Sequence, residues 1–320
     1  MSFWQKTLFR SSAVLKAALG LALFLGVEYF ALYIFEYLSI DRKIYKGTCN
    51  FITCILMFIA MFIVHKVCSL NKEPLFRIKK LDSGQIISLV VISLGMLGIV
   101  VTYLAVANAI SQYYQSLNQA IADYRESVNR FSDTPQAVIP VWDTVLYVFT
   151  LSFLVPITEE MTFRGVVFGQ LRRAFGPTVS VILSAVGFGI MHGLSVHIGY
   201  ALACGLILAA CYYLTDSLMA PAILHTVFNI LGSGLPTLFA VEEFGIPAGI
   251  SSGIMLWINT IATLFMPVSV IAMAYLVSAK RKKAKEAAAL METAVSAEAV
   301  QSEDDKVTDA VTSDDSGAVS

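Results

Sequence analysis

The chain has 320 residues, of which 57% are hydrophobic and only 14% are charged. Soluble domains usually contain about 25% charged and about 45–50% apolar residues, so this composition excludes an ordinary soluble globule, a disordered chain and a collagen-like protein. The formal net charge of −1 conceals an asymmetry, because residues 286–320 hold nine of the 23 acidic residues and only one of the 22 basic ones. No exposed basic face is left over for nucleic acid, which is therefore not an expected partner.

Long apolar runs predict an all-α, polytopic membrane helix bundle of about eight transmembrane helices, since one spanning helix needs about 20 apolar residues. Residues 111–140 are expected to form a polar external loop with a short amphipathic helix, and the acidic tail is expected to be disordered. We divide the chain into N-terminal helices with the external loop (1–140), a core (141–235), a C-terminal helix with a basic flank (236–285) and the tail (286–320). The runs lie near 13–39, 49–65, 86–110, 141–170, 178–196, 198–214, 218–235 and 253–279.

The basic residues predict that both termini face the cytoplasm. With the N-terminus inside, fifteen Lys and Arg residues fall in cytoplasmic segments and five in external ones, as the positive-inside rule requires. An odd number of helices would place the basic cluster at 280–285 on the wrong side. We expect an integral protein of the bacterial cell membrane.

Ionisable residues inside predicted spans are candidate functional residues, because burying them in lipid is costly. Glu160 precedes Arg164 by four residues, the spacing and order that favour an ion pair within one helix. Glu159 points about 100° away from Glu160 and needs another partner. Two further polar residues, Asp143 and His197, are expected to be solvated and interfacial.

Helix geometry predicts that Glu159 meets His192. Both lie about 16 residues from a tight connection near 174–177, or about 24 Å along two antiparallel helices. His225 and Asn229 are four residues apart and share one face of a later helix. We expect one shared cavity in the cytoplasmic half of the membrane. A carboxylate with a nearby imidazole can activate water, and a second imidazole with an amide can stabilise an oxyanion.

The three motifs Glu159-Glu160-x-x-x-Arg164, Phe188-x-x-x-His192 and His225-x-x-x-Asn229 resemble those of the type II CAAX prenyl endopeptidases and their bacterial relatives, the CPBP or Abi intramembrane proteases. The resemblance covers about residues 141–235, the expected CPBP protease core. It implies that Glu159 is the base that activates water and that His192 assists. It further implies that His225 and Asn229 form the oxyanion hole, and that Glu160 and Arg164 orient the first glutamate or the substrate.

The expected function is an intramembrane endopeptidase that hydrolyses a membrane-associated or CAAX-like peptide without a cofactor. The expected partners are a peptide or membrane-protein substrate and the lipid bilayer. A zinc-dependent version of the same protease stays open, although no HExxH motif exists and the two histidines are 33 residues apart. A non-catalytic bacteriocin self-immunity protein and a proton-driven transporter stay open as well.

Overall fold

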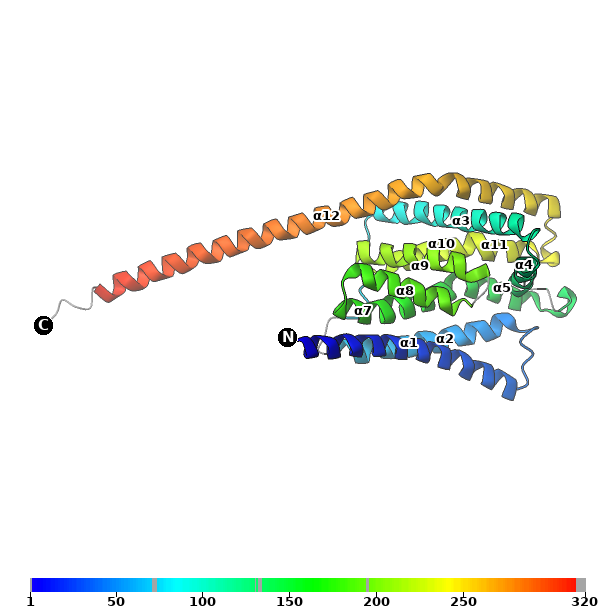
Figure 1. Cartoon of the computed structure of the whole chain (residues 1–320), viewed down its shortest axis with the longest axis horizontal. Coiled ribbons are helices and arrows are strands. Elements are labelled where there is room, and N and C mark those ends of the chain that lie inside the picture. Colours follow the sequence, from blue (N-terminus) through cyan, green and yellow to red (C-terminus); the bar gives the residue numbers. More distant parts are fainter. Residues whose placement is uncertain (1, 71–73, 130, 132–133, 194–195, 315–320) are drawn as a thin grey trace. The chain divides into compact units, whose positions relative to one another are not determined.

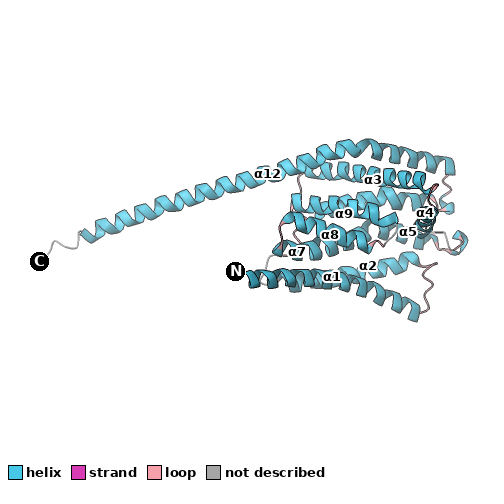
Figure 2. Cartoon of the chain, viewed as in Figure 1, coloured by secondary structure: helices cyan, strands magenta, loops and turns pink. Residues whose placement is uncertain are grey.

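The computed structural model describes residues 2–70, 74–129, 131, 134–193 and 196–314. At residue 137 and from residue 294 onward it describes the backbone only. All regular elements of these residues are helices (Figures 1 and 2). In chain order the α-helices are α1 (Phe3–Tyr37), α2 (Lys46–Ser69), α3 (Ser83–Ser111), α4 (Gln115–Val128), α5 (Val141–Phe149), α6 (Val155–Glu160), α7 (Phe168–Ala174), α8 (Pro177–Met191), α9 (Val196–Thr215), α10 (Met219–Asn229), α11 (Leu235–Phe239) and α12 (Ala248–Asp314). Two short 3₁₀ turns, η1 (Gln136–Val138) and η5 (Glu242–Phe244), lie in connections.

The predicted all-α polytopic membrane fold is confirmed. Seven helical segments of the described residues are long and apolar enough to cross a membrane. The eighth predicted run, 178–196, corresponds to α8, which is apolar but has only 15 residues and ends at Met191. A 15-residue helix spans about 22 Å, short of the roughly 30 Å hydrocarbon core, so α8 reaches only part of the way across.

The chain divides into two compact units, Met1–Ala274 and Tyr275–Ser320. The tail predicted to be disordered, residues 286–320, is helical as far as Asp314, because α12 continues to that residue. Residues 268–314 contain neither glycine nor proline and are rich in alanine, glutamate and lysine, which have high helix propensity.

Three π-helical turns interrupt the helices of the central segment. They are η2 (Thr150–Leu154) and η3 (Met161–Val167), which join α5, α6 and α7 into one helix, and η4 (Ile230–Gly234), which joins α10 to α11. A π turn holds one extra residue, which rotates the following residues and redirects backbone carbonyls. Arg164 lies within η3, η4 directly follows Asn229, and η2 ends five residues before Glu159.

The start of α2 is tied to α5 by Asp143. Its carboxylate accepts hydrogen bonds from the backbone nitrogens of Gly47 and Thr48, each at 2.8 Å, and from the Thr48 hydroxyl at 2.7 Å. The prediction of a solvated Asp143 is wrong, because the side chain is fully buried. The N–H groups in the first turn of a helix lack intrahelical acceptors and carry a partial positive charge, so a carboxylate is stabilised there. A Cβ atom on Gly47 would collide with the Asp143 backbone, which explains the glycine.

Asp216 fixes the connections at one end of the bundle, which we call the basic end. It forms ion pairs with Arg77 (3.0 Å), Lys79 (2.7 Å) and Arg172 (2.9 Å), which precede α3 or end α7. The opposite end carries α4, which follows the far end of α3 (Figure 1). We call it the α4 end. The position of the site described next is given relative to these two ends.

Candidate active site

Four of the predicted site residues line one cavity of about 400 Å³, the site cavity. Glu159 reaches it from α6, His192 from the C-terminal cap of α8, and His225 and Asn229 from α10. The predicted convergence of these side chains is therefore present in the structure. One carboxylate, two imidazoles and an amide face the same space, which is the arrangement needed to polarise a bound carbonyl and a water molecule.

Glu160 and Arg164 form a buried layer behind the site cavity. The predicted ion pair is present, with Arg164 Nη1 at 2.8 Å from Glu160 Oε1 and both side chains at 0% exposure. Arg164 also donates through Nη2 to the Gly205 carbonyl at 3.1 Å, and its guanidinium lies 4.5 Å from the centre of the Phe188 ring. Neither residue is among the described side chains that line the cavity.

His225 connects this layer to the cavity. Its Nδ1 lies 2.9 Å from Glu160 Oε1, and because a carboxylate oxygen can only accept, Nδ1 is the donor. Its Nε2 lies 3.8 Å from Glu159 Oε2. In the structure, Glu160 contacts both His225 and Arg164, and the predicted role of Glu160 and Arg164 in orienting Glu159 or the substrate stays a prediction.

His192 presents one defined nitrogen to the cavity. Its Nδ1 lies 2.8 Å from the Phe188 carbonyl oxygen, which can only accept, so Nδ1 carries a proton. In the neutral ring Nε2 is then the nitrogen that can take up a proton. Phe188 belongs to the same helix turn and packs its ring 4.3 Å from the imidazole, which fixes the orientation of His192.

Asn229 is anchored by a π turn. Its Nδ2 donates to the Leu151 carbonyl at 2.8 Å, and Leu151 lies within η2. The π turn redirects this carbonyl out of the regular helical pattern, which makes it available to a side chain from α10. One amide N–H is thereby used, and the other remains as a donor that the amide can offer to a ligand.

Three aromatic residues of the site cavity were not predicted. His197 was expected at the interface, but its ring lies 4.8 Å from that of His192 and lines the cavity. Tyr200 lies one turn further along α9, and its hydroxyl is 3.0 Å from that of Tyr124 on α4. The amphipathic pattern of the loop predicted the helix that carries Tyr124, but no sequence signal showed where this helix docks.

The predicted depth in the membrane stays a prediction, but the structure shows where the site lies between the two ends of the bundle. The sequence placed it in the half of the membrane that holds the basic connections, the basic end of the bundle. In the structure, His192 caps the end of α8 furthest from Arg172, and α4 contributes Tyr124, Ser127 and Val128 to the cavity. The site cavity therefore extends from the middle of the bundle toward the α4 end.

Besides His197, the potential metal ligands that line the site cavity are the Glu159 carboxylate and the ring nitrogens of His192 and His225. Nδ1 of His192 donates to the Phe188 carbonyl and Nδ1 of His225 donates to Glu160. In each ring Nε2 is therefore the nitrogen that takes no part in these hydrogen bonds. Within the described part of the chain, no three His, Cys, Asp or Glu side chains are grouped to hold a metal ion. Metal dependence stays a prediction to be measured.

Comparison with known proteins covers this same region. Residues 141–231 match the family model described as type II CAAX prenyl endopeptidase Rce1-like. A curated relative, "Putative membrane peptidase YdiL" of Bacillus subtilis (strain 168), is 30% identical over 121 residues, which is 38% of this chain. The chain thus spans about half the length of that relative. No solved structure matches the chain. The matched range contains all six predicted site residues, so residues 141–231 of this integral membrane protein are similar to the Rce1-like type II CAAX prenyl endopeptidases.

Proposed function

We propose that the protein is an intramembrane endopeptidase in which Glu159 activates water. One observation carries this proposal: Glu159, His192, His225 and Asn229, from three separate helices, line a single cavity. The match of this segment to a family of membrane endopeptidases supports it.

In the proposed reaction the Glu159 carboxylate takes a proton from a water molecule, and the resulting hydroxide attacks the carbonyl carbon of the scissile peptide bond. His192 Nε2 assists by accepting a hydrogen bond from the same water. The tetrahedral intermediate places negative charge on the former carbonyl oxygen, and the second Nδ2 hydrogen of Asn229 donates to it. The C–N bond then breaks as the proton taken from the water passes to the leaving amine.

His225 serves this reaction through its position between two carboxylates. Nδ1 is held by Glu160, which is in turn held by Arg164, so the ring has one fixed orientation. Nε2, at 3.8 Å from Glu159 Oε2, is an acceptor in the neutral ring, and it can donate to the oxyanion once it has taken up the proton that Glu159 draws from water. Glu160 and Arg164 are positioning residues in this proposal, since they do not line the cavity.

The proposed substrate is a peptide or membrane protein whose scissile segment enters the bilayer. The positive-inside rule supports cytoplasmic termini, and in that orientation the site cavity would open toward the outer leaflet. A leader peptide or a membrane-bound regulator fits this access as well as a lipidated C-terminal peptide does.

The test compares peptide termini in membrane fractions of cells that carry the wild type, Glu159→Gln or Glu36→Gln. Glu36 is an exposed carboxylate of α1 outside the described lining of the site cavity, so its variant is the matched control. We expect new termini with the wild type and with Glu36→Gln, and at least about 100-fold fewer with Glu159→Gln, because removing a general base costs about 10²–10⁴ in rate. Termini, or an immunity phenotype, that persist in Glu159→Gln would indicate that the cavity binds rather than hydrolyses.

A further inference from the structure

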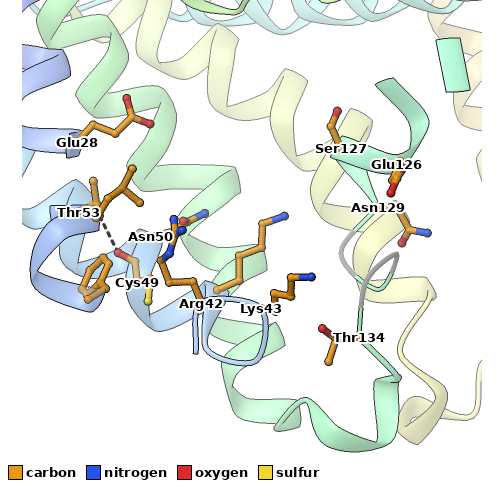
Figure 3. A pocket seen from close by; sticks show the side chains of 13 residues that line it. Glu28, Arg42, Lys43, Cys49, Asn50, Thr53, Glu126, Ser127, Asn129 and Thr134 are labelled. Carbon is orange, nitrogen blue, oxygen red and sulfur yellow. Dashed lines mark hydrogen bonds between the residues drawn. The ribbon is translucent and has the colours of Figure 1, made fainter. Parts of the chain in front are cut away.

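A second cavity, the polar cavity, lies between the α1–α2 hairpin and α4. It has a volume of about 380 Å³, within the range of ligand-binding pockets. Figure 3 shows side chains of α1, α2 and their connection facing those of α4 and the loop after it across this space. None of its lining residues belongs to the motifs, and all precede residue 141, outside the segment matched by the family model.

Three cations line the polar cavity at the α1–α2 connection. Arg42 and Lys43 lie in the connection itself, and Lys46 is the first residue of α2, with its amine 5.3 Å from the Tyr147 ring centre. Two carboxylates, Glu28 and Glu126, also line the cavity, which leaves an excess of one positive charge. The charges are separated, because the cations gather at the helix ends and Glu28 lies about 14 Å back along α1.

Further polar side chains line the polar cavity along α2, beyond the three cations. Asn50 and Thr53 follow Lys46 along α2 and reach about 10 Å from its start. The Thr53 hydroxyl donates to the Cys49 carbonyl at 2.9 Å, but an acyl chain in this position would leave the amide N–H and C=O groups of Asn50 without partners, which is costly. A peptide backbone offers a donor and an acceptor at each residue and satisfies them. The lining therefore favours a peptide over the tail of a lipid.

The polar cavity adjoins the site cavity. Ser127 of α4 lines both cavities, and the carboxyl groups of Glu28 and Glu159 are close enough to interact electrostatically. A peptide bound in the polar cavity could thus continue past Ser127 to the proposed catalytic groups.

We propose that the polar cavity is a substrate subsite, in which Arg42, Lys43 and Lys46 bind a carboxylate of the peptide. This inference rests on the proposed function and deepens it, because it names the substrate as a peptide with an anionic group near the cleaved bond. Glu28 repels a carboxylate from the deep end, so the anionic group lies at the α1–α2 connection and the rest of the peptide points toward Ser127. The carboxylate belongs either to an acidic side chain or to the peptide's C-terminus.

The test measures peptide binding rather than cleavage. The full chain carrying Glu159→Gln is placed in phosphatidylcholine nanodiscs, and binding is followed by the anisotropy of three dansyl-labelled octapeptides of alanine, leucine and asparagine. One peptide is neutral with a C-terminal amide, one has a single Asp in place of Asn, and one has a free C-terminal carboxylate. We expect at least one anionic peptide to bind about three- to tenfold more tightly than the neutral one, as a few partly exposed charge pairs allow. The tighter of the two identifies the source of the carboxylate.

Two variants decide the assignment. Arg42→Gln with Lys43→Gln should remove the preference for the anionic peptide over the neutral one. Lys80→Gln with Lys285→Gln, two exposed lysines outside the lining of the polar cavity, should retain the preference. The subsite assignment is overturned if neither anionic peptide binds better than the neutral one, or if the preference survives in Arg42→Gln/Lys43→Gln. Because the protein lacks the proposed base, this result is independent of hydrolysis, whereas the comparison of membrane peptide termini reports hydrolysis alone.

Discussion

Replacing Arg164 by methionine should destabilise the protein by about 3–5 kcal/mol, the usual cost of leaving a buried charge without its partner. The guanidinium donates to Glu160 and to the Gly205 carbonyl and lies over the Phe188 ring, and the side chains of Arg164 and Glu160 are both at 0% exposure. Methionine is of similar length and fills the space, so the loss is mainly electrostatic. Glu160 would remain in the bundle with His225 as its partner among the described residues.

The double variant Glu160→Gln/Arg164→Met isolates the pair. Glutamine keeps an oxygen for His225 Nδ1 and removes the unpaired charge, so we expect the double variant to be more stable than Arg164→Met alone by about 2 kcal/mol or more. The free energy of unfolding is measured by titrating detergent-solubilised protein with sodium dodecyl sulfate. Arg281→Met, at an exposed position of α12, is the control and should change it by less than about 0.5 kcal/mol. If Arg164→Met cost below about 1 kcal/mol, or if the two changes were additive, the buried layer would not be held by charge.

Three further predictions concern the fold and the chemistry. Asp143→Asn should lower the free energy of unfolding by about 2–4 kcal/mol, since a carboxylate that accepts three hydrogen bonds is weakened, and Thr48→Val by only about 1 kcal/mol; equal losses in thermal unfolding would contradict the capping role. Gly98→Ala should cost about 1–3 kcal/mol because a Cβ there collides with the Ala262 backbone of α12, whereas Gly26→Ala, in open space within α1, should be neutral or stabilising by up to about 1 kcal/mol. Peptidase activity should persist after prolonged dialysis against a strong chelator; activity that disappears and returns with added zinc would favour the zinc-dependent alternative.

Much of the site could be predicted because it depends on helix periodicity. Equal distances from one connection placed Glu159 opposite His192, and the spacing of four residues placed Glu160 beside Arg164. The contact between Glu160 and His225 could not be predicted. The π turn η3 after Glu160 changes the direction of the following residues, and it carries no sequence signature. The burial of Asp143 could not be predicted for a similar reason. Its partner is the first turn of α2, 95 residues earlier in the chain, and local hydropathy contains no information on that contact.

The fold was predictable to the extent that lipid imposes long apolar helices. The spans near 13–39, 86–110 and 253–279 correspond to α1, α3 and the first part of α12. The position of the site between the two ends of the bundle was not predictable, because the length of α8 depends on where its chain turns at His192 and Gly193. Gly193 has a φ of +86°, a conformation that glycine adopts at little cost and that allows the chain to leave the helix there.

The link between Asp143 and α2 bears on whether residues 141–231, the segment that matches the family model, can be expressed on their own. Its first residues supply the cap for a helix that lies outside it, and Met161, Val166 and Phe168 share an apolar cluster with Met57, Met61 and Phe76 of the earlier segments. Excising residues 141–231 would expose that cluster and leave the Asp143 carboxylate without its hydrogen-bond donors on α2. The homology boundary is thus not a folding boundary, and engineering or chimera work on this protein should carry the first two spans along with the motifs.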